Sequence, residues 1–187
     1  MNTFRSSRWA LLFAAVAVAY GALMALAGAG RSHAAQGGVP ANLVPPDGQV
    51  LQRELLGIGA QVYTCRASAT AGSGFEWAFT APAAVLLDDS GAIAGTHFAG
   101  PTWQANDGSS VTAEVVERAP SAEPSAIPWL LLRVTAAGAP GSFGGVAYIQ
   151  RLETTGGVAP TVGCDEEHAG VVARVPYSAV YAVYGAP

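Results

Sequence analysis

The richest group of polar and aromatic residues lies in residues 95–111, GTHFAGPTWQANDGSSV. It contains His97, Trp103 and Asp107, which supply an imidazole, an indole and a carboxylate. The Asp-Gly pair after Asn106 is typical of a hairpin turn, in which the central residues accept positive φ. We therefore expect a strand, a turn and a second strand, with His97 and Trp103 just before the bend.

A second polar group, Asp165–His168, directly follows Cys164 and has the sequence DEEH. If the fold brings it beside His97, with Asp107 across the turn, these groups predict a metal site or an acid–base pair. The spacings match neither H-x-H, H-E-x-x-H nor C-x-x-C, so no known ligand motif supports the metal. The alternative is a hydrogen-bonded His97 within β structure and an Asp107 that serves the turn.

Residues for covalent catalysis do not form a recognisable set. No candidate serine nucleophile lies in a G-x-S-x-G elbow; the candidates are Ser109, Ser110, Ser125, Ser142 and Ser178. The glycine-rich segment 141–145 lacks the lysine of a phosphate loop. A carboxylate pair for sugar hydrolysis stays open, because the sequence does not decide which way Glu76, Glu114 and Glu153 point.

Aromatic residues supply a second hypothesis, a groove for a sugar or an apolar ligand. Aromatic faces with a few convergent polar groups are a common way to build such a pocket. The alternative is that the same residues form the core of a small β domain. The residues concerned are Trp77, Trp103, Trp129, Tyr63, Tyr148, Tyr177, Tyr181 and Tyr184.

The elements that must position these groups are predicted to be strands. From Val50 onward, short alternating or β-branched segments are separated by turns rich in Gly, Pro, Asp and Ser, and no segment keeps a capped 3.6-residue period. Segment 127–135 has apolar residues on both faces, so we expect it to be covered on both. The pattern predicts an all-β sandwich or barrel of about nine to eleven short strands, a single domain over residues 49–187.

Residues 1–34 have the order of a secretory signal peptide. Arg5 and Arg8 precede an uncharged run over residues 9–30, and Ser32-His33-Ala34 places small residues where a signal peptidase cuts. The alternative is an uncleaved membrane anchor, since the run is long enough to cross a bilayer. Residues 35–48 then predict an extended, Pro- and Gly-rich lead-in. This order favours a secreted or periplasmic protein.

The two cysteines, Cys65 and Cys164, predict one disulfide. An even number of cysteines in an exported chain is typical of a bridge rather than of a metal or redox role. The bridge would close a loop of about 100 residues, for which the chain-entropy treatment gives about 4–5 kcal/mol of stabilisation.

The charge balance excludes two classes of partner. Without its leader the chain keeps six Arg against thirteen Asp and Glu, has no Lys, and carries a net formal charge of −7. Such a surface repels nucleic-acid phosphates and anionic lipid, so we expect neither nucleic acid nor, after leader removal, a membrane as partner. No cofactor is predicted, a small molecule or glycan is the expected partner, and the oligomeric state is left open.

Several longer motifs carry a resemblance to a known family. They are GAQVYTC (59–65), WAF (77–79), GTHFAGPTWQANDGS (95–109), IPWLLL (127–132), YIQRLETTGGVAP (148–160), Cys164 and VPYSAVY (175–181). Together they resemble an uncharacterised family of exported proteins of bacteria and fungi, described only as a domain of unknown function. Some fungal relatives carry a malate dehydrogenase label, but no G-x-G-x-x-G follows a strand and no alternation of strands and helices exists to support it. The resemblance implies export and names no activity.

The sequence as a whole favours a non-catalytic ligand-binding or envelope interaction module. The candidate binding residues are His97, Trp103, Asp107, Trp129, Asp165 and His168. The alternative is a secreted or periplasmic enzyme, hydrolytic or metal-dependent, centred on His97, Asp107 and the Asp165–His168 cluster.

Overall fold

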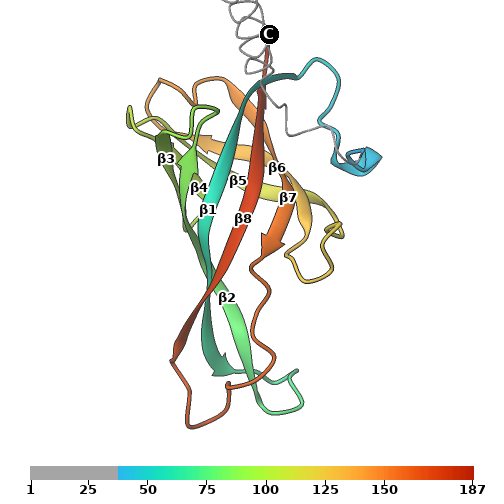
Figure 1. The fold of residues 1–187 in the computed structure, drawn as a ribbon, viewed down its shortest axis with the longest axis vertical. Helices are drawn as coiled ribbons and strands as arrows, with labels where there is room; N and C mark the ends of the chain where they lie inside the picture. Colours follow the sequence, from blue (N-terminus) through green and yellow to red (C-terminus); the bar gives the residue numbers. More distant parts are fainter. Residues whose placement is uncertain (1–37) are drawn as a thin grey trace, which may run out of the picture. The chain divides into compact units, whose positions relative to one another are not determined.

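The computed structural model describes residues 38–187, which form an antiparallel barrel. Each strand pairs with the next along the chain, and β1 pairs with β8 to close the barrel (Figure 1). The strands are β1 (Val50–Ala67), β2 (Phe75–Leu87), β3 (Ile93–Phe98), β4 (Thr102–Ala105), β5 (Ser110–Ala119), β6 (Trp129–Ala137), β7 (Val146–Gly156) and β8 (Val172–Gly185). The all-β prediction is confirmed, with eight strands rather than nine to eleven.

The strand count is lower than expected because three strands run on through residues that usually interrupt β structure. β1 continues through two glycines, β2 through Pro82 and β8 through Pro176. Each proline lies just outside the strand pairing on the side away from β1, because β3 joins β2 only from Ala84 and β7 joins β8 only from Tyr177. On that side Pro176 only accepts a hydrogen bond, from the N–H of Gly157. A residue without an N–H group is tolerated at such an edge.

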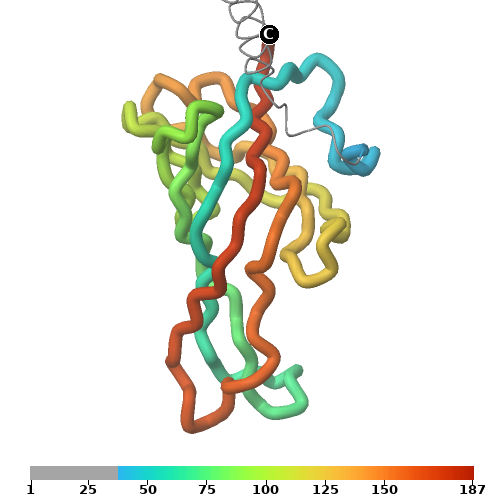
Figure 2. Tube along the Cα trace, in the orientation of Figure 1, coloured from blue at the N-terminus to red at the C-terminus, as the bar shows by residue number. Residues whose placement is uncertain are grey.

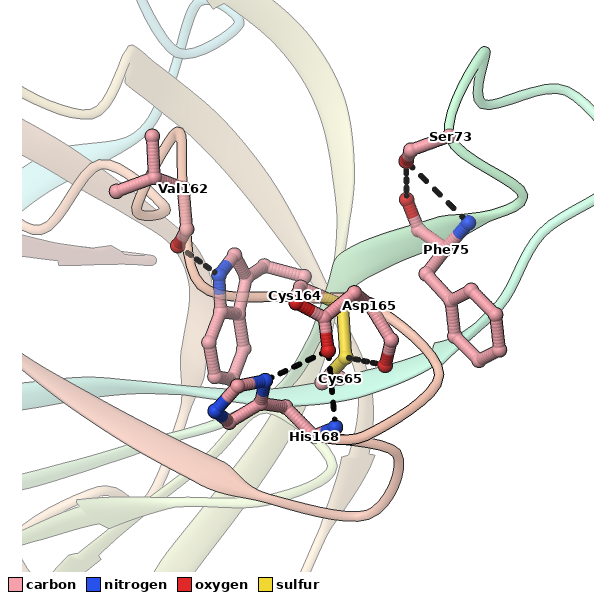
Figure 3. Close-up of a disulfide and its surroundings, with 8 residues drawn as sticks. Cys65, Ser73, Phe75, Val162, Cys164, Asp165 and His168 are labelled. Carbon is pink, nitrogen blue, oxygen red and sulfur yellow. Dashed lines mark hydrogen bonds and ion pairs between the residues drawn. A yellow bond between two sulfur atoms is a disulfide. The ribbon is translucent and has the colours of Figure 1, made fainter.

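Beyond these two prolines, the ends of β1, β2 and β8 continue as a three-stranded extension of the barrel (Figure 1 and Figure 2). Cys65, near the end of β1, is joined to Cys164 in the β7–β8 loop, so the predicted disulfide is confirmed. The loop is also tied to the extension by a 2.9 Å hydrogen bond from Trp77 Nε1 to the carbonyl of Val162 (Figure 3). The extension and the loop therefore form one cross-linked unit at one end of the barrel.

The main core fills the barrel. Strand alternation sends every second side chain inward, and the inner set is mostly aliphatic and aromatic. Its largest fully buried members include Leu86, Trp103, Val111, Ile149, Tyr181 and Val183. An eight-stranded barrel has an interior that side chains fill or that holds one small ligand.

A second, smaller core lies on the outer face of the barrel. Residues 35–48 were expected to be extended, but the described part contains a 3₁₀ turn, η2 (Ala41–Leu43), whose Leu43 is fully buried with Trp129 and Leu131. Gln150 Nε2 donates a 2.6 Å hydrogen bond to the Leu43 carbonyl and fixes the turn against β7. The first half of β6 is therefore covered on both faces, as its sequence predicts.

The predicted signal peptide, residues 1–34, lies outside the described residues, as does the start of the lead-in. Within residues 38–187, no helix has the length and apolar composition needed to span a bilayer.

Candidate functional site

His97 and Trp103 face each other across a hairpin that the sequence prediction missed. Residues 95–111 were expected to bend once, at the Asp-Gly turn, but they bend twice, because β3 and β4 are joined by a tight turn at Gly100-Pro101. His97 and Trp103 are direct cross-strand partners in that first hairpin. Their rings stack with centroids 4.1 Å apart and planes inclined by 15°. The Gly-Pro dipeptide is the signal that predicts this turn.

The burial of His97 decides its protonation. Only 3% of the residue is exposed, and its Nδ1–H donates a 2.9 Å hydrogen bond to the carbonyl of Thr102. Burial lowers the pKa of His97 to about 4, against the effect of that hydrogen bond. The imidazole is therefore neutral at physiological pH, and its Nε2 carries a lone pair rather than a proton.

A cavity of about 100 Å³ opens beside this pair inside the barrel. Its lining combines aromatic, aliphatic and polar side chains from all eight strands and the β3–β4 turn. They are Gln61, Phe79, Pro82, His97, Pro101, Trp103, Val115, Leu130, Leu132, Arg151 and Tyr181. Phe79 and Val115, which are 55% and 40% exposed, mark an apolar mouth.

Two cavity-lining residues carry buried N–H donors without an acceptor. Trp103 Nε1 and Gln61 Nε2 are covered by protein atoms rather than open to the cavity, and within residues 38–187 neither has a hydrogen-bond partner. Burial raises the pKa of the Tyr177 hydroxyl, and the nearby Gln61 amide offsets a small part of that shift without reaching hydrogen-bond geometry. Each unpaired buried donor costs about 1–3 kcal/mol.

Tyr181 closes the cavity from β8. It is fully buried, and its hydroxyl shares a 3.0 Å hydrogen bond with the hydroxyl of Tyr177. Burial raises the pKa of Tyr181 well above its ordinary value, so the phenol stays protonated. Gly57 on β1 makes room for the ring, because a Cβ at that position would lie 2.5 Å from Tyr181 Cε2.

Arg151 brings a positive charge to the cavity wall. Its Nε and Nη2 donate to the carbonyl of Pro128 at 3.2 and 2.8 Å. No carboxylate lies on the cavity wall, and within the described residues no ion pair involves this guanidinium. Burial lowers the pKa of Arg151 from its usual value, which leaves the group charged at neutral pH.

Sequence reasoning did not single out Gln61 or Arg151. The signal that could have found these two residues is the alternation of side chains between the two faces of a strand. Gln61 is two residues before Tyr63 on β1, and Arg151 is two residues after Ile149 on β7, so each polar residue shares a face with a buried one. A polar residue in phase with a buried face is the mark of an inward-pointing functional group.

Asp107 lies in the β4–β5 turn, where it organises backbone rather than the cavity. One carboxylate oxygen accepts hydrogen bonds from the N–H and hydroxyl of Ser109, and the other accepts from the N–H of Ser142 at 2.7 Å. These bonds, that of the Ser109 hydroxyl above all, hold the pKa of Asp107 well below its ordinary value. In the turn only Gly108 has positive φ, at 85°, whereas we expected it of both central residues.

Asp165 and His168 pair with each other on the β7–β8 loop. The Asp165 carboxylate accepts from His168 Nδ1 at 2.6 Å, beside the disulfide (Figure 3). Both side chains are about half exposed, and neither lines the cavity. This contact lowers the pKa of Asp165. Trp129 lies in the outer core.

Of the six candidate binding residues, therefore, the structure brings two, His97 and Trp103, into one cavity. The residues predicted for an enzyme site do not come together, because Asp107, Asp165 and His168 all lie outside the cavity that His97 lines. Within residues 38–187, no group of three or more His, Cys, Asp and Glu side chains is arranged to hold a metal ion.

Fold and site together define a closed antiparallel barrel with a small, largely apolar cavity beside His97 and Trp103. The family described as "Protein of unknown function (DUF3455)" matches residues 89–185, just over half of the chain, and the chain belongs to it. The predicted membership of a domain-of-unknown-function family is thus confirmed. Searches of curated proteins and of solved structures found no match to the chain.

Proposed function

We propose that the protein is a non-catalytic binding protein that takes a small, polar-headed molecule into the barrel cavity. The observation that supports this proposal is a largely apolar cavity beside the His97–Trp103 pair, whose lining includes a polar group, Arg151, that has no acidic partner within residues 38–187. An eight-stranded barrel can hold one small ligand in such a space. The guanidinium would bind the polar head of that ligand.

The cavity volume limits the ligand. At about 100 Å³, it is smaller than an engineered cavity of about 150 Å³ that accepts benzene. The enclosed part of the ligand is thus a group of a few heavy atoms. A larger molecule must extend through the apolar mouth at Phe79 and Val115.

Binding is better supported than acid–base catalysis. An effective general base has a pKa near the working pH, whereas burial lowers the pKa of His97 to about 4. The carboxylates that an enzyme would need beside it are in a turn and on a loop, not on the cavity wall.

We also propose that the protein acts outside the cytoplasm after removal of residues 1–34. The Cys65–Cys164 disulfide is compatible with an oxidising compartment. Intact-mass measurement of exported protein tests this, and a mass that still includes residues 1–34 would refute cleavage.

The binding proposal is tested by indole NMR on protein labelled with ¹⁵N-tryptophan. A panel of small acids, amides and alcohols should shift the Trp103 indole proton saturably, while the Trp77 indole, already bonded to Val162, stays in place. Val115→Phe, at the mouth, should abolish the shift. Val116→Phe is the matched control, because Val116 is equally exposed, 39% against 40%, but does not line the cavity. Equal loss in both variants, or no shift with any compound, would refute the proposal.

A further inference from the structure

We infer that the cavity selects a monocarboxylate with an apolar body, whose carboxylate head binds Arg151. This inference rests on the proposed function and adds the charge and the orientation of the ligand. It depends on two observations: a guanidinium without an acidic partner within residues 38–187, and an apolar mouth.

The cation stands out against the charge of the whole molecule. Residues 38–187 contain thirteen Asp and Glu against six Arg, yet no acidic side chain is on the cavity wall. The charged and titratable groups that act on Arg151 are Tyr181, Tyr177, Tyr63 and Arg118, and none of them is a carboxylate. A second positive charge, that of Arg118, therefore acts on Arg151, and no carboxylate does.

The strand register explains why Arg118 and Arg151 lie on the same face of the sheet. Arg118 on β5, Leu130 on β6 and Arg151 on β7 are successive cross-strand partners. Cross-strand partners lie on the same face of a sheet, and Leu130 belongs to the core inside the barrel. Both guanidinium groups therefore start from the inner face, Arg151 at the cavity wall and Arg118 exposed at the end of its strand.

The donor set fits a planar anion. Two N–H groups of Arg151 are used by the Pro128 carbonyl, and within residues 38–187 the others donate to no acceptor. Guanidinium presents paired donors that match the two oxygens of a carboxylate. The neighbouring His97 and Tyr181 bring no charge, because both are neutral.

The mouth determines the polarity of the rest of the ligand. Phe79, Pro101 and Val115 offer apolar surface and no hydrogen-bond donor from their side chains. A carboxylate therefore enters first, and an aliphatic or aromatic body stays at the mouth. A doubly charged phosphate would leave one charge uncompensated in a small apolar space, which is costly.

The test compares sodium butyrate with butyramide, its neutral analogue of the same size, and with inorganic phosphate, by titration of the Trp103 indole signal. Butyrate should bind about 10-fold more tightly than butyramide, the difference expected between charge-assisted and neutral hydrogen bonds, and phosphate should not compete. Arg151→Met should remove the preference for butyrate. Arg133→Met should retain it, because Arg133 is exposed and paired with Glu114.

The butyrate-to-butyramide ratio in the wild-type protein keeps the inference testable even if Arg151→Met fails to fold. Equal affinities for the two, or tighter binding of phosphate, would overturn the carboxylate assignment while leaving the cavity a binding site. If none of the three probes, and none of the wider panel, moves the Trp103 indole, the proposed function fails as well.

Discussion

His97 and His168 are the two histidines of residues 38–187, and they lie in regions that are stabilised in different ways. His97 is stacked on Trp103 inside the barrel, and burial makes it neutral. His168 is about half exposed on the β7–β8 loop, where it contacts Asp165. The barrel interior is held by packing of alternate side chains, whereas the loop is held chiefly by one disulfide and a few hydrogen bonds.

The contrast teaches that residue type alone does not make a site. An imidazole beside a carboxylate on a solvated loop interacts weakly, since exposed ion pairs contribute about 0–1 kcal/mol. A neutral imidazole buried inside the barrel, beside a guanidinium without an acidic partner, changes the local energetics far more. The four experiments below test that difference, from the largest expected effect to the smallest.

Removing the disulfide should produce the largest loss. Cys65→Ala combined with Cys164→Ala should lower the free energy of unfolding by about 2–5 kcal/mol, because the unfolded chain regains the entropy of a long loop. Urea denaturation measures it. The Trp77 indole signal should move in the folded variant and the Trp103 signal should not, since only Trp77 is bonded to the loop. If the Trp77 and Trp103 indole signals moved by the same amount, the barrel and the loop would behave as one unit.

Acidification should destabilise the barrel through His97. The unfolded chain binds this proton near pH 6.5 and the folded chain only near pH 4, so stability is fully present above pH 6.5 and falls by roughly 3 kcal/mol as the pH drops to 4. His97→Asn should remove this slope in urea titrations at a series of pH values. His168→Asn should keep it. An unchanged slope in His97→Asn would mean that another group is responsible.

Filling the space under Tyr181 should have a smaller effect. Gly57→Ala places a methyl group 2.5 Å from the buried Tyr181 ring, and overpacking of this kind costs about 1–3 kcal/mol. Gly72→Ala is the control, because a Cβ there meets nothing within 4 Å. Thermal unfolding followed by circular dichroism compares the two. A Gly57→Ala protein as stable as the Gly72→Ala protein would show that the Tyr181 ring can move into the cavity and relieve the overlap.

The loop pair should contribute least. His168→Ala should change the free energy of unfolding by less than about 0.5 kcal/mol, as expected for an exposed pair. It should leave butyrate binding at the Trp103 indole unchanged. A measurable loss of ligand affinity would place the loop, contrary to our proposal, at the cavity.

The fold could be predicted from local patterns to a large extent. Alternation and turn residues predicted strands and no helices, and the cysteine count predicted the bridge. The number of strands was overestimated because Pro82 and Pro176 look like strand ends. Only the missing partner on one side of β2 and of β8 shows why these prolines are tolerated.

The candidate site was predicted less well. His97 and Trp103 were chosen from a dense stretch of sequence, and the structure does place them in one cavity. The role of Asp107 is local, and its turn chemistry was the alternative considered. Gln61 on β1 is far along the chain from Arg151 on β7 and Tyr181 on β8, so no spacing could join the three residues.

The sequence by itself determined which side chains share a face of each strand, because the period of two is a property of the extended backbone and needs no neighbour. It also determined the sulfur pair, because the chain has only two cysteines. Only the tertiary structure decided that Gln61, His97, Trp103, Arg151 and Tyr181 surround one space. That meeting depends on the register of every strand pair and on the closure of β1 against β8, and register is set by contacts between residues distant in the chain.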